Sequence, residues 1–253
     1  MLSAVLWVLG PILECLLLIR AVQGNFLKEY KIFYLYIAWV LLRDLSLFAV
    51  YHAWALGYAY VYWYSQFFSV LVGCGVVWEI YRAALANYSG AARMARSVLL
   101  FLFIITMSRI VVFAVNSAKW LPGQTTLETE REFRIFQSVV LMGLVGLLAY
   151  YAIPTGRNLK GIILGYGFFL ATSLVQLTLR DFLGDTFQHW WQYIQPTTYI
   201  AVLLIWCRTL WTFAPARDSG SEARIESDYQ SLAFETKKQL KAAASYIVKV
   251  IRS

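Results

Sequence analysis

The sequence predicts an all-α membrane protein: a bundle of seven transmembrane helices followed by an amphipathic helix. Of its 253 residues, 60% are apolar and only 14% are charged, whereas about a quarter of a soluble domain is charged. The apolar residues gather in seven stretches of roughly 20 residues, the length that crosses a hydrocarbon core of ~30 Å. The period-2 alternation of an outer-membrane barrel is absent, which leaves helices as the spanning elements.

The expected spanning helices cover residues 2–22, 32–51, 60–82, 96–115, 131–153, 161–179 and 191–211. The first is not expected to be a cleaved signal, because no basic region precedes it, and Pro11 and Glu14 interrupt its apolar run. At the inner end of the third, Glu79 is expected to be wetted by the cytoplasm. In the sixth, the Gly161-x-x-x-Gly165 pattern is predicted to bring two helices together.

The distribution of Lys and Arg predicts the orientation. The first, third and fifth loops and the end of the last helix hold most of these residues: Arg20, Lys28, Lys31, Arg82, Arg93, Arg96, Arg157, Lys160 and Arg208. Basic residues next to spans stay in the cytoplasm, so we expect the N-terminus outside and the C-terminus inside, in the plasma (inner) membrane. The net charge of +8 therefore indicates orientation and contact with anionic lipid, and not nucleic-acid binding.

The sequence divides into three parts: a seven-helix domain over 1–213, a polar linker over 214–227 and a basic amphipathic helix over 228–253. The basic residues of this last helix are Lys237, Lys238, Lys241, Lys249 and Arg252. Because its apolar residues fall on the other face, we expect it to lie on anionic lipid headgroups at the cytoplasmic surface. Docking to a cytoplasmic protein partner is the alternative.

Four charged residues lie near the middle of the predicted spans: Glu14, Arg43, Asp44 and Arg109. Charges at the bilayer centre cost several kcal/mol and tend to mark functional sites. Arg43 and Asp44 diverge by about 100° on a helix, so they are expected to have different partners. We predict that Glu14 or Asp44 pairs with Arg109. The group is interpreted either as a structural ion network or as a ligand or proton site in the bundle core.

A second polar cluster is predicted at the outer mouth. Glu130, Arg134 and Gln137 share one helix face at i, i+4 and i+7, with Arg131 beside them. Arg180 lies in the next outer loop. Since Arg suits planar carboxylate and phosphate groups, the cluster is a candidate site for a small polar or anionic ligand. The alternative is a solvated collar of salt bridges.

Enzyme chemistry has no positive support in the sequence. His52 and His189 are its two histidines, too few for a His-rich zinc hydrolase site, and H-E-x-x-H is absent. Neither a G-x-S-x-G elbow nor a phosphate-binding or dinucleotide-binding glycine pattern occurs. We therefore predict no metal and no cofactor, and we favour a function without catalysis over an enzyme.

Two short motifs carry a family resemblance. Residues 78–82 (Trp-Glu-Ile-Tyr-Arg) close the third helix, and Glu130, Arg131, Arg134 and Gln137 open the fifth. Both resemble features of bacterial seven-helix integral membrane proteins of this size whose activity is unassigned. The resemblance covers the seven helices and not the tail. It implies a bacterial plasma membrane and no particular mechanism.

Three functions remain open at this point. The first is a non-enzymatic module that binds or senses a small ligand, or docks a partner, through a polar site in the bundle. The second is a small-solute transporter with a three-plus-one-plus-three helix plan, suggested by the matched positions Trp63 and Trp191, and Trp78 and Trp206. The third is an accessory subunit of a membrane complex.

Overall fold

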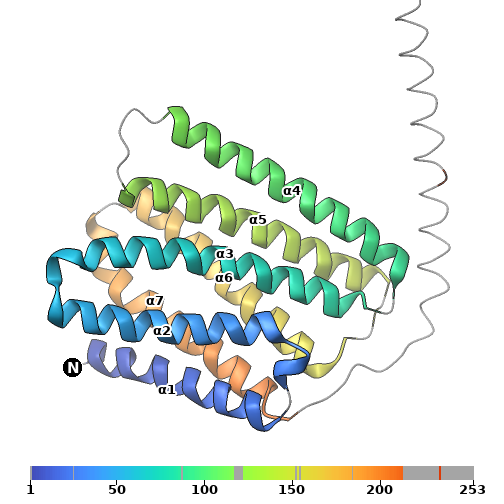
Figure 1. The fold of residues 1–253 in the computed structure, drawn as a ribbon, viewed down its shortest axis with the longest axis horizontal. Helices are drawn as coiled ribbons and strands as arrows, with labels where there is room; N and C mark the ends of the chain where they lie inside the picture. Colours follow the sequence, from blue (N-terminus) through green and yellow to red (C-terminus); the bar gives the residue numbers. More distant parts are fainter. Residues whose placement is uncertain are drawn as a thin grey trace, which may run out of the picture.

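The structure, a computed structural model, describes residues 2–24, 26–86, 88–116, 122–151, 153, 155–183, 185–212 and 234. This part of the chain is helical throughout (Figure 1). The helices are α1 (Leu2–Gln23), α2 (Lys31–Ala53), α3 (Tyr58–Ala84), α4 (Ser89–Asn116), α5 (Pro122–Tyr150), α6 (Arg157–Leu183) and α7 (Asp185–Thr209). Two short 3-10 turns, Phe26–Lys28 and Ala55–Gly57, join α1 to α2 and α2 to α3.

Five segments are long and apolar enough to cross a membrane: α2, α3, Ala95–Val112 of α4, Thr129–Tyr150 of α5 and Arg157–Leu179 of α6. This confirms the predicted helical class, and the length and composition of these helices are compatible with the predicted membrane protein. Several helices extend beyond the predicted spans, most clearly α5, which begins at Pro122 and not at 131. Hydropathy identifies only the apolar segment that can lie in the hydrocarbon core. The helix itself can continue through polar residues on either side of that segment. Proline is favoured at a first helical position because its missing N–H has no intrahelical partner there.

Six of the seven helices form a ring. α1 packs against α2 and α7, α2 against α3, α3 against α5, α5 against α6, and α6 against α7. α4 lies outside this ring and packs mainly on α5, as the outermost helix at the top of Figure 1. The arrangement is therefore six helices around a centre with one helix on the flank.

Close packing between α6 and α7 depends on two glycines. A Cβ added to Gly165 would meet the indole of Trp206, and one added to Gly161 would meet the side chain of Thr209. The predicted role of this glycine pair in bringing two helices together is thus confirmed. Trp206 is fully buried, and Phe33 of α2 packs edge-on against it with 4.9 Å between ring centroids.

The start of α2 is held by a carboxylate from α3. The Oε1 and Oε2 atoms of Glu79 accept hydrogen bonds from the backbone N–H groups of Ile32 (3.0 Å) and Phe33 (2.8 Å). Glu79 is only 2% exposed, so the expectation that the cytoplasm wets it is wrong. The first N–H groups of a helix have no intrahelical acceptors. The side chain of Tyr30 at the N-cap makes no capping bond. Glu79 supplies the missing acceptors for two of these N–H groups.

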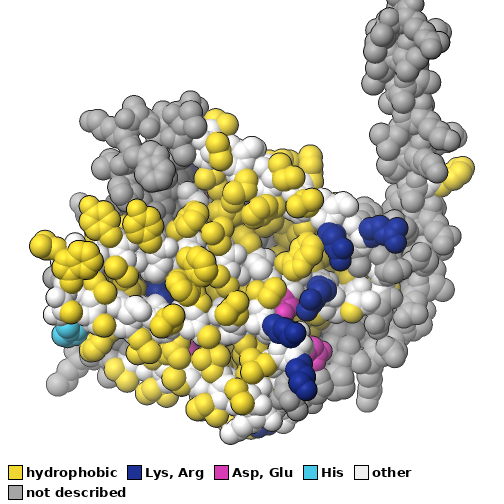
Figure 2. Space-filling model, in the orientation of Figure 1, with side chains coloured by type: hydrophobic (Ala, Val, Ile, Leu, Met, Phe, Trp, Pro, Cys, Tyr) yellow, Lys and Arg dark blue, Asp and Glu magenta, His cyan; other side chains and the backbone are white. Residues whose placement is uncertain are grey.

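Apolar side chains cover most of the visible face of the molecule (Figure 2). Lys and Arg side chains gather toward one end in that view, where α2 begins and α3 ends. An apolar surface this extensive suits lipid and not water. Of the predicted linker and amphipathic helix, residues 214–227 and 228–253, only Phe234 is described. Lys237, Lys238, Lys241, Lys249 and Arg252 lie outside the described residues.

Candidate functional site

A polar pocket of about 230 Å³ lies inside the ring, in the half of the bundle where α2 ends and α3 begins. All six ring helices line it, while the described side chains of α4 contribute none. Its polar and aromatic lining consists of Tyr36, Arg43, Asp44, Tyr58, Tyr62, Gln66, Ser69, Glu130, Arg134, Phe169, Ser173, Gln176, Gln195 and Tyr199.

One wall of the pocket is an ion pair on α5. The Arg134 guanidinium lies 3.3 Å from Oε1 of Glu130, and Gln66 of α3 donates to the same oxygen at 2.7 Å. The guanidinium also lies over the ring of Phe169, 4.5 Å from its centroid. Arg134 is only 4% exposed. For this pair the alternative interpretation as a solvated collar does not hold, because the Arg134 guanidinium is buried in the bundle.

Gln137 continues the same face of α5 one turn deeper, as its predicted spacing requires. Its amide donates to the Val70 carbonyl at 3.0 Å and to Sγ of Cys74 at 3.3 Å, and its oxygen accepts a bond from the Tyr166 hydroxyl at 3.2 Å. Gln137 is fully buried and lies outside the pocket lining. It joins α5 to α3 and α6 beneath the pocket.

The opposite wall carries the predicted intramembrane charges. Arg43 and Asp44 of α2 both line the pocket, and the Arg43 guanidinium lies 5.8 Å from the ring centroid of Tyr62. Glu14 of α1 is fully buried and accepts a hydrogen bond from the Tyr199 hydroxyl at 2.7 Å. Because Tyr199 itself lines the pocket, Glu14 lies directly behind the wall.

Arg109 does not join this group. Its guanidinium pairs with Glu132 of α5 at 2.9 Å, and its side chain is 68% exposed. The predicted pairing of Arg109 with Glu14 or Asp44 is wrong, because α4 lies outside the ring. Arg131 is partly buried on α5 and is not among the pocket residues. Arg180 belongs to α6, and its side chain lies outside the described part of the structure.

Four buried polar atoms in or behind the pocket wall have no hydrogen-bond partner: Glu14 Oε2, Arg43 Nε, Gln66 Oε1 and Arg134 Nε. Two of these atoms are donors and two are acceptors. A buried polar group without a partner costs about 1–3 kcal/mol, so such groups normally bind water or a ligand. The pocket can therefore satisfy a molecule that both accepts and donates hydrogen bonds.

Tyr36, Tyr62 and Tyr199 line the pocket but were not predicted as site residues, although the sequence holds a signal for such positions. On several helices the polar or aromatic residues of the lining are three, four or seven positions apart. They are Tyr36 and Arg43 on α2, Tyr62, Gln66 and Ser69 on α3, and Phe169, Ser173 and Gln176 on α6. This spacing places them on one face of each helix. Which of these faces point at one another is decided only by the packing of the ring.

The described residues hold no group of three or more His, Cys, Asp or Glu side chains that could bind a metal ion. Comparison of the chain with protein-family models, with curated proteins and with solved structures finds no match.

Proposed function

We propose that this chain is a seven-span plasma-membrane protein that binds a small polar ligand in the pocket inside its ring, as a binding or sensing module. The observation that carries the proposal is the set of three buried polar atoms without partners, on Arg43, Gln66 and Arg134, in the lining of one cavity of about 230 Å³. Glu79 provides the contrast, because both of its carboxylate oxygens accept hydrogen bonds within the protein at the start of α2.

The seven spans and their orientation are part of the proposal. α1 and α7 complete the ring beside α2 and α6, which are long and apolar enough to span, so they share the same depth of membrane. The basic end of the molecule in Figure 2 suits the cytoplasmic side, which leaves the N-terminus outside. Arg20 at this end donates from Nε to the Trp211 carbonyl at 2.8 Å and so joins the inner ends of α1 and the last turn after α7.

The cytoplasmic segment 228–253 is proposed to lie on anionic lipid headgroups through Lys237, Lys238, Lys241, Lys249 and Arg252. A cytoplasmic partner protein is its alternative contact. Since the pocket lies far from this segment in sequence and in the opposite half of the membrane, deleting 228–253 is expected to leave ligand binding intact. Loss of binding would contradict the separation of the two parts.

The test is native mass spectrometry of the full chain released from its own membrane in a lipid-preserving polymer. Wild type is expected to carry a non-protein mass at fixed stoichiometry. Arg43→Gln is expected to lower its occupancy about tenfold or more, because a hydrogen bond to a charged group contributes about 1.5–3 kcal/mol. Arg109→Gln is the matched control: it also removes one guanidinium, but outside the ring, and should retain the mass.

Three outcomes would contradict the proposal. The first is a wild-type protein that carries no bound mass. The second is an Arg43→Gln protein that melts at a lower temperature yet binds as wild type does, which indicates a structural ion network. The third is a stoichiometric partner protein without a small ligand, which indicates an accessory subunit.

Small-solute transport is the second candidate, and one observation favours it. The helix triples α1–α3 and α5–α7 together surround the pocket, and α4 lies outside, as a three-plus-one-plus-three plan requires. The matched tryptophans argue against a true repeat, because Trp206 is fully buried whereas Trp78 is 37% exposed beside Arg96. Transport predicts that proteoliposomes accumulate the identified ligand and that Arg43→Gln abolishes this flux. Ligand binding without flux would contradict transport and support the binding or sensing module.

A further inference from the structure

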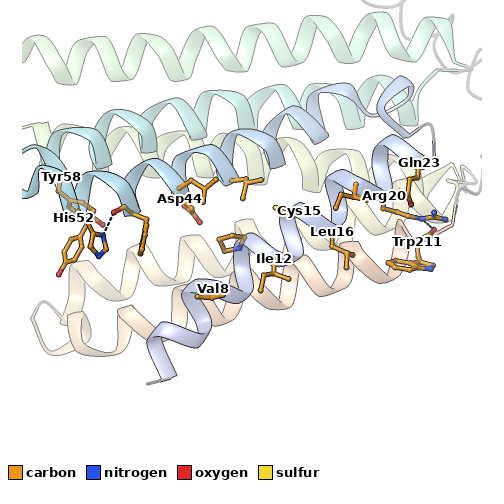
Figure 3. A pocket seen from close by; sticks show the side chains of 16 residues that line it. Val8, Ile12, Cys15, Leu16, Arg20, Gln23, Asp44, His52, Tyr58 and Trp211 are labelled. Carbon is orange, nitrogen blue, oxygen red and sulfur yellow. Dashed lines mark hydrogen bonds between the residues drawn. The ribbon is translucent and has the colours of Figure 1, made fainter.

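A long apolar groove runs beside the pocket, between α1 and α2 on the surface of the bundle (Figure 3). Its volume is about 1400 Å³, and Ile12, Leu16, Leu45 and Phe48 form much of its wall. Figure 3 shows His52 and Tyr58 at one end and Arg20, Gln23 and Trp211 at the other. The groove follows α1 from Val8 to Gln23, a distance of roughly 23 Å at 1.5 Å per residue.

The groove and the polar pocket are adjacent. Pro11, Asp44 and Tyr58 line both of them. Asp44 lies midway along the groove and points from α2 toward α1 (Figure 3). Between α1 and α2, the side chains shared by the two linings are therefore what stands between the polar pocket and the groove on the outer surface.

We propose that the ligand of the pocket is a membrane phospholipid, whose headgroup occupies the pocket and whose acyl chain lies in the groove. This inference rests on the proposed function and adds the class of ligand. An apolar groove that meets a polar pocket matches the two halves of an amphipathic molecule, and acyl chains are the apolar groups that surround this face.

The unpartnered donor and acceptor atoms of the pocket indicate which chemical groups the lipid headgroup should carry. The unpartnered Nε atoms of Arg43 and Arg134 need an acceptor, which a phosphate provides. The unpartnered oxygen of Gln66, in the same lining, needs a donor, which an ammonium or hydroxyl group provides. Phosphoethanolamine carries both kinds of group on one short headgroup, so phosphatidylethanolamine is the probe of choice.

The experiment compares two ligands on the lipid-depleted full chain, by native mass spectrometry: phosphatidylethanolamine and its deacylated headgroup, glycerophosphoethanolamine. Wild type is expected to bind the lipid at least about tenfold more tightly than the free headgroup, because each buried CH₂ contributes about 0.8 kcal/mol and a tail has many.

Two leucines of α2 provide a matched pair of variants. Leu45 lines the groove and is 55% exposed, whereas Leu42 is 57% exposed and lies outside the groove lining. Leu45→Trp is expected to fill the groove and weaken lipid binding about tenfold, the loss for about two displaced methylene groups. Leu42→Trp should bind as wild type does. Ile12→Trp, on the α1 wall, repeats the test if Leu45→Trp lowers the melting temperature of the lipid-free protein.

The outcomes separate this inference from the proposed function. If wild type binds the free headgroup or another soluble molecule as tightly as the lipid, and Leu45→Trp binds equally, the lipid inference is overturned while the polar site stands. If Arg43→Gln has no effect on any bound molecule, the polar site itself fails. If wild type is dimeric and Leu45→Trp makes it monomeric without affecting lipid binding, a second copy covers the groove and the lipid inference is overturned.

Discussion

Two groups of buried polar side chains, among the residues that the structure describes, differ in their partners. Glu79 and Gln137 bond to backbone and side-chain groups of neighbouring helices and so join them. Arg43 and Gln66, by contrast, each keep an unpartnered atom at the edge of a cavity. Residues of the first group are expected to determine stability, and residues of the second to determine ligand binding, because only the second group has capacity left for another molecule.

Glu79→Gln provides the stability test at the scale of one residue. The carboxylate accepts two N–H bonds, whereas an amide has one acceptor oxygen and directs an NH₂ group at the second N–H. We expect the free energy of unfolding to fall by about 2 kcal/mol, the contribution of a hydrogen bond to a charged group. Thermal melting of the purified protein measures this.

Arg82→Gln is the control for that variant. Arg82 lies 4.0 Å from Glu79, but its side chain is 61% exposed, and exposed ion pairs contribute about 1 kcal/mol or less. Equal losses in the two variants would show that the ion pair matters as much as the contact of Glu79 with the start of α2.

At the scale of the helices, two glycines in neighbouring elements have opposite surroundings. Gly165 of α6 lies against Trp206 of α7, whereas a Cβ added to Gly146 of α5 would have no neighbour within 4 Å. Gly165 therefore sets the distance between two helices, and Gly146 does not. α6 and α7 both line the pocket, so a change in their separation also changes the site.

Gly165→Ala is expected to destabilise the protein by about 1–3 kcal/mol, because the methyl group forces α6 and α7 apart in a packed core. Gly146→Ala is expected to be neutral or to stabilise by up to about 1 kcal/mol, since alanine is the better helix former. Thermal melting should thus show a lower melting temperature for Gly165→Ala and no decrease for Gly146→Ala. A comparable loss for Gly146→Ala would refute this account of the packing.

At the scale of the whole molecule, the protein has two unlike ends. The polar pocket lies in the half where α2 ends, and the basic side chains gather at the end where α2 begins. The proposed orientation exposes the pocket half to the outside and the basic end to the anionic cytoplasmic leaflet.

Reporter fusions test this orientation. Green fluorescent protein joined after Ser253 is expected to fluoresce, and alkaline phosphatase at the same place is expected to be inactive, because the phosphatase needs an oxidising exterior. Fusions after Ala53, at the end of α2, should give the reverse pattern. An active phosphatase after Ser253 would invert the proposed topology.

The helical class and the location of most spans were predictable from the sequence alone. In lipid, each apolar stretch must hydrogen-bond its own backbone N–H and C=O groups, which a helix does. Hydropathy therefore predicts each helix separately, whatever the neighbouring segments are. The shared face of Glu130, Arg134 and Gln137 was predictable for the same reason, since it follows from helical spacing. The sequence did not predict which helix faces point at one another in the ring of six helices. The order of the helices and their rotation about their axes depend on packing.

The partners of the charged residues were decided by the tertiary structure. Arg109 and Arg134 are both arginines in apolar helices, yet Arg109 is exposed on α4 while Arg134 is buried beside the pocket. Their difference arises because α4 lies outside the ring and α5 belongs to it. By itself the sequence determined a helical membrane protein with buried charges. Which charges meet, and that they surround one cavity inside the ring, was decided only by how the helices pack, since that choice depends on contacts between residues far apart in the chain.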